Sequence, residues 1–342
     1  MKIYSFSDIS TLLFEFNTAV PGTVTSTGDT LETVTSVGGS AHPVVVEVAA
    51  GTVDQFYKVN QLTVGAMPAI SIEQNTDEAS SALGQLNNPT TFATHNGATS
   101  AFIAAVGTDT YSSYHYFCLR PSELGITATS GNRHMRMNKT LTSYPGRDAS
   151  WGDQFHTLGI TCAAVDDQGK YYENGELAIS DIPGPTASVN QLNWMCRGQW
   201  GQQLIGGSSI MVAYAKQVTD EEAKAIHDLM WYWQEVAQDP TDPHAPVALP
   251  VPDSTMAAGD TLQIDLNPYI YNDAQTVTAW AVGTAPAGVS VAGGVVTVGA
   301  VTPVGTHTIN IDATNATGTR AVTLKVAVSS ISMTNPTFPY GD

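Results

Sequence analysis

The stretch "FHTLGITCAAVDDQGKYYENGELA", Phe155–Ala178, contains a complete β-hairpin signature. Tyr171 and Tyr172 are neighbours, so a strand would place their rings on opposite faces. Asn174 and Gly175 follow, and both residues tolerate the positive φ angles of a two-residue turn. Glu176 and Leu177 then begin the return strand. The pattern predicts a tight hairpin at a sheet edge, with a ligand-binding role for the tyrosines as the alternative.

Further β-like runs surround this hairpin. They are separated by Gly, Asn, Asp, Ser and Pro, which favour turns for distinct backbone reasons. The clearest runs are Val44–Gly51, Thr99–Gly107, Tyr114–Arg120, His156–Asp166 and Ser208–Ala215. Together they predict an all-β fold.

One helix is predicted, in "VTDEEAKAIHDLMWYWQEVAQ" from Val218 to Gln238. Thr219 followed three residues later by Glu222 is a capping box. Ile226, Met230 and Trp233 recur at helical spacing. We expect one apolar stripe of this helix to pack on a sheet.

The order of hairpin, "QLIGG", strand and helix resembles the laminin-G/concanavalin A-like jelly-roll family. The matching positions are Tyr172, Asn174, Gly175, Glu176, Leu177, Val218–Glu222 and Ile226. The resemblance covers about Phe155 to Leu229. It implies an N-terminal jelly-roll sandwich over residues 1–238 that ends in one helix, with residues 1–60 as a candidate attachment region.

A proline-rich segment, "DPTDPHAPVALPVPD", follows at residues 239–253, and its five prolines favour extended backbone. We interpret it as a linker. Short alternating strands over 254–329 then predict an Ig-like β-sandwich, and 330–342 is expected to be a tail. Ala285–Val328 resembles Ig-like and cadherin-like surface modules, but Asp312 stands nearly alone, so the cadherin calcium ligands are not evident.

Composition restricts the partners. The chain has 342 residues, 13 bases against 31 acids and a net charge of -18. Free nucleic acid needs a positive surface and is therefore not expected as a partner. Cys118, Cys162 and Cys196 have no regular spacing and are expected to be small buried side chains. No run is apolar enough to predict membrane insertion.

Catalytic and cofactor motifs are absent from the sequence. It contains no G-x-S-x-G, H-E-x-x-H, phosphate-binding loop or dinucleotide fingerprint. The acids at 220–222 are explained by helix capping. Asp166 and Asp167 are interpreted as a turn, with cation binding as the alternative. We therefore predict a protein that is not an enzyme, with no cofactor and no metal.

A basic stretch stands out on this acidic chain, "GNRHMRMNKTLTSYPGRDASW" from Gly131 to Trp151. Arginines beside aromatic rings suit carboxylated sugars or an acidic protein surface. A solvated hairpin with scattered charge is the alternative. The candidate ligand- or partner-binding residues are Arg133, His134, Arg136, Lys139, Tyr144, Arg147 and Trp151.

Two surface modules, few charges and a start compatible with synthesis in a cytoplasm favour a structural protein of a virion surface. We expect a bacteriophage capsid decoration or a tail or fibre component, assembled in the host cytoplasm. Its partners would be other virion proteins, copies of itself and a host glycan. One alternative is a glycan-binding adhesion protein of a bacterial cell surface, and another is a polysaccharide-degrading enzyme.

Overall fold

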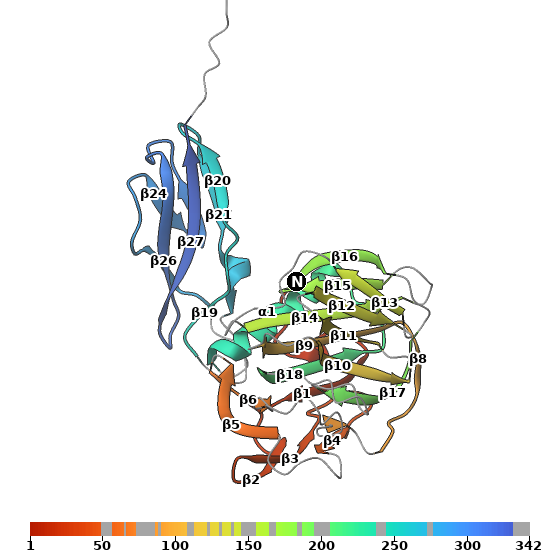
Figure 1. Cartoon of the computed structure of the whole chain (residues 1–342). Coiled ribbons are helices and arrows are strands. Elements are labelled where there is room, and N and C mark those ends of the chain that lie inside the picture. Colours follow the sequence, from red (N-terminus) through yellow and green to blue (C-terminus); the bar gives the residue numbers. More distant parts are fainter. Residues whose placement is uncertain are drawn as a thin grey trace, which may run out of the picture. The chain divides into compact units, whose positions relative to one another are not determined.

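A computed structural model describes residues 1–48, 57–64, 66–72, 86–87, 90–107, 113–121, 124–129, 132–137, 140–144, 155–163, 169–182, 187–194, 206–236, 244–271 and 276–330. Two compact units make up the chain: unit 1, Met1–Gln238, and unit 2, Asp239–Asp342. Both consist of strands, and the described residues include a single α-helix, so the all-β prediction is confirmed. Each unit is drawn in Figure 1.

The strands of unit 1 pair to form two sheets. In the first sheet the pairing order is β16-β15-β14-β9-β18-β1, and β6 also pairs with β18. These strands are β16 (Glu176–Ile182), β15 (Gly169–Glu173), β14 (Phe155–Cys162), β9 (Thr99–Gly107), β18 (Gly206–Tyr214), β1 (Leu12–Asn17) and β6 (Met67–Ile72).

The second sheet runs from β13 through β12, β11, β10 and β17 to β7 and β8, and from β7 through β4 and β3 to β2. Strand β5 (Tyr57–Val64) pairs with both β3 and β6 and so connects the two sheets. The other bounds are β13 (Thr140–Tyr144), β12 (Asn132–Met137), β11 (Leu124–Thr129), β10 (Ser113–Pro121), β17 (Ala187–Trp194), β7 (Leu86–Asn87), β8 (His95–Gly97), β4 (Val45–Val48), β3 (Thr30–Thr35) and β2 (Val24–Thr27).

One apolar core joins the two sheets into a sandwich. Phe16 of β1 and Trp194 of β17 pack with their ring centroids 5.2 Å apart, although they belong to different sheets. The Trp194 indole also donates to the hydroxyl of Ser208 on β18, at 3.0 Å. Phe14 and Phe16 are fully buried. The N-terminal segment that we considered as an attachment region therefore supplies part of the core of unit 1.

Helix α1 (Asp220–Val236) packs on unit 1 through contacts with β14, β16 and β6. Its predicted apolar residues Ile226, Met230 and Trp233 are all buried. The helix also buries two polar side chains, His227 and Gln234, which the apolar pattern did not predict. A short 3-10 helix, η1 (Phe6–Asp8), precedes β1.

Unit 2 is a smaller sandwich with its own core. One sheet has the order β20-β27-β26-β23 and the other β21-β25-β24. Valines of β25 pack against Ile, Val and Leu side chains of β26 and β27. The bounds are β20 (Ser254–Ala257), β27 (Thr319–Ser329), β26 (Gly305–Thr314), β23 (Ala279–Val282), β21 (Leu262–Asp265), β25 (Val295–Val298), β24 (Val289–Ala292), β19 (Val247–Ala248), β22 (Ile270–Tyr271) and the 3-10 helix η2 (Asn267–Tyr269).

Part of the proline-rich segment is packed into the second sandwich of unit 2. Strand β19 pairs with β22, and the backbone N–H of Leu249 donates to the carbonyl of Tyr269 at 2.9 Å. Val247 and Leu249 are both buried. Residues 244–249, which the sequence assigned to the linker, are thus packed within the second sandwich. The expected tail from 331 onward lies outside the described residues.

Among the described residues, no helix combines the length and the apolar character needed to cross a bilayer.

Candidate functional site

The described part of the predicted basic stretch lies on two strands of the second sheet of unit 1, at residues 132–137 and 140–144. Arg133, His134 and Arg136 belong to β12, and Tyr144 ends β13. The register pairs Arg133 directly with Tyr144. Residues opposite one another in an antiparallel pair are close neighbours. The structure therefore brings together one of the predicted arginines and one of the predicted aromatic residues.

The other members of the stretch are distributed differently. His134 is paired with Ser143 and Arg136 with Leu141. Lys139, Arg147 and Trp151 lie outside the described residues. Within the part of the chain that the structure describes, the residue-by-residue register of β13 is with β12. The described part of the basic stretch is thus placed at the outer end of a sheet.

The predicted turn at Asn174 and Gly175 is confirmed, and it is held from two sides. The φ angles are +51° and +79°. The Asn174 backbone N–H donates to the Thr157 carbonyl at 2.9 Å, and the Asn174 side-chain oxygen accepts from the Thr157 N–H at 3.1 Å. Both tyrosines before the turn are buried, Tyr171 in the sandwich core and Tyr172 beside Phe102. The hairpin is therefore a structural element, packed on both faces.

A buried histidine of α1 lies under this turn. The ring Nδ1 of His227 is hydrogen-bonded to the hydroxyl of Thr157 at 2.5 Å. Burial, with the nearby charges of Lys224 and His156, lowers the pKa of His227 to about 3. The imidazole is therefore neutral at physiological pH, and its role is to hold the helix against β14.

The first turn of α1 also uses its acids for packing. The Asp220 carboxylate accepts from the Lys170 ammonium at 2.7 Å and from the Tyr172 hydroxyl at 2.8 Å. These two hydrogen bonds lower the pKa of Asp220 below its ordinary value. The helix start is thereby fastened to β15.

The capping box is formed as predicted. The Glu222 N–H donates to the Thr219 hydroxyl at 3.1 Å, and the Thr219 N–H donates to the Glu222 carboxylate at 2.9 Å. Burial alone would raise the pKa of Glu222, but hydrogen bonds from Lys216 and Thr219 bring it below its ordinary value. Both acids are thus accounted for by the helix start and its contact with β15.

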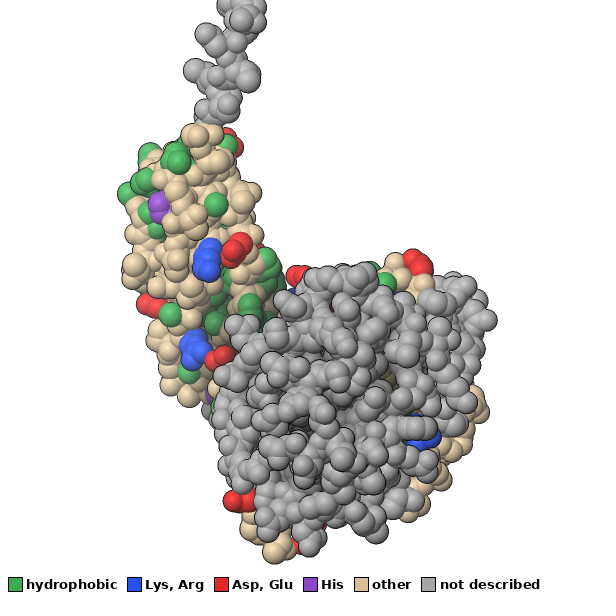
Figure 2. All heavy atoms as spheres, viewed as in Figure 1, with side chains coloured by type: hydrophobic (Ala, Val, Ile, Leu, Met, Phe, Trp, Pro, Cys, Tyr) green, Lys and Arg blue, Asp and Glu red, His purple; other side chains and the backbone are tan. Residues whose placement is uncertain are grey.

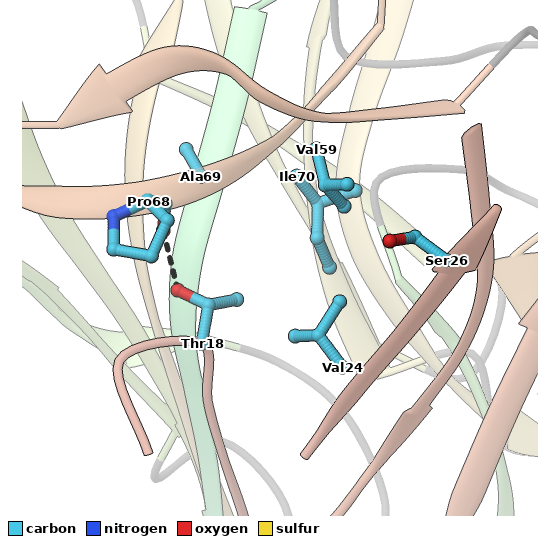
Figure 3. Close-up of a pocket in the computed structure, with 7 residues that line it drawn as sticks. All are labelled: Thr18, Val24, Ser26, Val59, Pro68, Ala69 and Ile70. Carbon is cyan, nitrogen blue, oxygen red and sulfur yellow. Dashed lines mark hydrogen bonds between the residues drawn. The ribbon is translucent and has the colours of Figure 1, made fainter. Parts of the chain in front are cut away.

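A small pocket opens beside β2, β5 and β6 (Figure 3). Its volume is about 200 Å³, below the ~300–1,000 Å³ of most small-molecule sites. Val24, Val59 and Ile70 supply apolar walls, and the Thr18 hydroxyl donates to the Pro68 carbonyl. Sequence patterns did not identify this pocket, because its walls come from distant strands.

Metal ligands do not gather in the described part of the chain: it has no group of three or more His, Cys, Asp or Glu residues placed to hold an ion. Asp166 and Asp167, the candidate cation-binding turn, lie outside the described residues. Cys118 and Cys162 are buried, as expected, and Cys196 is not among the described residues.

No protein-family model matches the chain, and no curated protein matches it. Solved structures do resemble it. A Trypanosoma rangeli sialidase in complex with 2,3-difluoro-KDN matches at 12% identity and a TM-score of 0.42, over 64% of this chain and 32% of that chain. This chain therefore spans about a third of the sialidase.

Two further structures are titled as binding domains. The CBM40 of a Ruminococcus gnavus IT-sialidase, bound to α2,3-sialyllactose, matches at 14% identity and a TM-score of 0.31, over 39% of this chain and 83% of that chain. The binding domain of Paraclostridial Mosquitocidal Protein 1 matches at 10% identity and a TM-score of 0.44, over 76% of this chain and 59% of that chain.

Proposed function

We propose that the chain is a non-enzymatic structural protein displayed in many copies on a virion surface, with unit 1 attaching to a carboxylated host glycan. A bacteriophage capsid decoration or a tail or fibre component fits this role. The alternative is an adhesion protein of a bacterial cell surface, which would use the same glycan-binding residues.

The pairing of Arg133 with Tyr144 is the observation that carries the glycan proposal. A guanidinium group can bind a carboxylate through two parallel hydrogen bonds, and an aromatic neighbour offers a flat apolar surface to a sugar ring. Both residues lie at the outer end of a sheet whose strands are fixed by continuous pairing through β11 to β10. A strand platform favours binding, because little backbone entropy is lost on ligand contact.

The structural use of the ionisable residues supports a role without catalysis. Asp220, Glu222 and His227 are three groups of the helix region that could serve acid–base chemistry, and each has a packing partner. Burial raises the pKa of a fourth group, Asp228, whose carboxylate is paired with the Lys224 ammonium. The lowered pKa of His227 lies far from the near-neutral value that a general base needs.

Unit 2 supports the multi-copy part of the proposal. Most outward positions of β26 and β27 carry small or uncharged polar residues, such as Thr308, Ala321 and Thr323, and the charged residues on these strands are Asp312, Arg320 and Lys325. On the face drawn in Figure 2, charged side chains of unit 2 are few. Sparse charge lets identical copies approach closely, because little like-charge repulsion opposes them.

The test replaces Arg133, Arg136 and Arg147 together by glutamate. We expect the triple variant to fold normally, to lose binding to carboxylated glycans and to label host cells at least tenfold less. The double variant Arg320→Glu/Lys325→Glu, on unit 2, is the control and should bind glycans like the wild type. Unchanged glycan binding by the folded triple variant would overturn the attachment role.

Two further measurements separate the alternatives. Protein identification in purified particles and in washed cell envelopes should find the chain in the particles, whereas recovery only from envelopes would favour the bacterial adhesion protein. A reducing-end assay with host polysaccharide should show no release of sugar. Release that scales with protein concentration would identify an enzyme instead.

A further inference from the structure

A second concave site of unit 1 lies away from the basic stretch. It is a groove of about 340 Å³ between the segment that leads into β4 and the segment that precedes β8. We call it the hydroxyl groove. Its lining includes Ser40, Pro43, Thr90, Thr91, Phe92 and Ala93.

The first wall of the groove is fixed to the sandwich by backbone hydrogen bonds. The N–H groups of Ser40 and Ala41 donate to the carbonyls of Leu12 and Leu13, at 2.9 and 2.8 Å. Gly39 has a φ of +104°, and a Cβ there would lie 2.3 Å from the Leu13 carbonyl oxygen. Only glycine permits this close approach, so the wall is positioned by β1.

The second wall is fixed by the other sheet. The Phe92 N–H donates to the Asn190 carbonyl at 3.1 Å, and the Asn190 side chain donates to the Thr94 hydroxyl at 3.3 Å. The Phe92 ring packs edge-on against Phe14 of the core, with centroids 5.8 Å apart. Both walls are thus preorganised, which lowers the entropy cost of binding a ligand.

The uncharged side chains, hydroxyl groups and rings of the lining indicate which class of ligand the groove can bind. The described residues that line the groove carry no charge, which gives no counterion to a carboxylate, phosphate or ammonium group. Within the described chain, the hydroxyls of Ser40 and Thr91 make no hydrogen bond, and each can both donate and accept. Phe92 is half-buried and Pro43 exposed, so two rings border the same space.

We propose that the hydroxyl groove binds a neutral sugar residue. Sugar hydroxyls match hydroxyl partners that both donate and accept, and the C–H face of a sugar ring packs on an aromatic or proline ring. The volume lies at the small end of the ~300–1,000 Å³ range, which fits a terminal sugar rather than the interior of a long chain. The inference rests on the proposed attachment role and extends it. One glycan chain could present a carboxylated sugar to β12 and a neutral sugar to the groove. Two separate glycans could also bind, one at each place.

The test uses the full chain on an array of neutral hexose, neutral N-acetylhexosamine and carboxylated glycans, followed by titration with the neutral glycan that binds. Ala93→Arg fills the groove from an exposed position and should weaken neutral-glycan binding at least tenfold. Thr91→Val removes one hydroxyl at nearly constant shape and should weaken it about threefold. Ala321→Arg, the same substitution at an exposed alanine of unit 2, should change nothing.

The outcomes separate this inference from the attachment role. Loss of neutral-glycan binding in Ala93→Arg, with carboxylated-glycan binding retained, would support a distinct neutral site. No neutral-glycan binding by the wild type, unchanged binding in Ala93→Arg, or capture of proline-containing peptides alone would overturn it. In each of those cases, the attachment role would still be tested independently, by measuring incorporation into particles and the loss of carboxylated-glycan binding in the arginine triple variant.

Discussion

His227 and Thr157 are hydrogen-bonded at 2.5 Å, although 70 residues separate them in sequence. The bond ties the middle of α1 to β14, in a place from which water is excluded. A histidine that is buried and neutral makes the fold sensitive to acid, because the unfolded chain takes up a proton that the folded chain does not accept.

The first prediction concerns this acid sensitivity. The ordinary pKa of histidine is 6.5, and that of His227 is lowered to about 3, so the stabilisation is complete above pH 6.5 and is lost as the pH falls toward 3. His227 alone contributes a slope of up to about 1.4 kcal/mol per pH unit in this window. His227→Gln should show a shallower fall in the free energy of unfolding, measured by urea denaturation at several pH values.

Thr157→Val is the matched control. It removes the hydrogen-bond partner but leaves the imidazole in place. We expect a loss of about 1–3 kcal/mol at pH 7 with the acid slope retained. Equal slopes in the wild type and His227→Gln would contradict the assignment of the acid response to this residue.

The second prediction concerns Gly175. A Cβ at this position would lie 2.8 Å from the Cβ of His227, and the residue has a φ of +79°. Gly175→Ala should therefore lower the free energy of unfolding by about 2–4 kcal/mol, through backbone strain and overpacking together.

Gly22 provides a control with the same backbone requirement. Its φ is +81°, and a Cβ there would meet nothing within 4 Å. Gly22→Ala should lose only the backbone part, about 1–2 kcal/mol. Thermal unfolding of both variants would measure the difference, and equal losses would show that the contact with His227 carries no cost.

The third prediction concerns Asn315 in unit 2. Its side-chain nitrogen donates to the His244 carbonyl at 2.8 Å, and its oxygen accepts from the N–H groups of Thr317 and Gly318. Asn315→Asp replaces a buried donor by an acceptor facing a carbonyl, so we expect a loss of about 2–3 kcal/mol in denaturant unfolding.

Asn310→Asp is the isosteric control, because the Asn310 side-chain oxygen accepts from the Thr323 hydroxyl at 2.9 Å and a carboxylate keeps that bond. It should change the stability by less than about 1 kcal/mol. A larger loss in Asn310→Asp than in Asn315→Asp would contradict the assigned donor role of Asn315.

The fourth prediction is that residues 239–342 fold without unit 1. This unit has a core of its own and the size of an ordinary small domain. The isolated fragment should unfold cooperatively, with coincident transitions by circular dichroism and tryptophan fluorescence. A broad, non-cooperative transition would show that unit 2 depends on unit 1.

The hairpin and the helix could be predicted because their signals are local. Asn174 and Gly175 determine a turn through their own φ preferences, and Thr219 and Glu222 satisfy one another's N–H groups within one helical turn. Patterns of this kind depend on neighbouring residues in the sequence, so they predict the same turn or helix start whatever the rest of the fold is.

Features that depend on distant residues could not be predicted in this way. The hydroxyl groove is formed by Ser40 and Thr91, which are far apart in sequence. The segment of Ser40 is held by β1 and the segment of Thr91 by β17, so the groove exists only in the folded sandwich. The burial of Gln234 depends on Ser209, to which it donates at 2.9 Å. Likewise, proline content favoured a linker at residues 244–249, but β19 finds its partner in β22, which the local sequence does not indicate.

The parallel pairing of β20 with β27 has a mechanical consequence. Ser254 is in register with Val326, and Ala257 with Ser329, so the two strands point the same way. A pull applied between residues 253 and 330 would act along both strands in opposite directions. The paired residues would then be loaded together in shear rather than peeled apart one after another. Such a parallel pair resists extension far better than its few hydrogen bonds would if they broke one after another, and this resistance would support the attachment role proposed above.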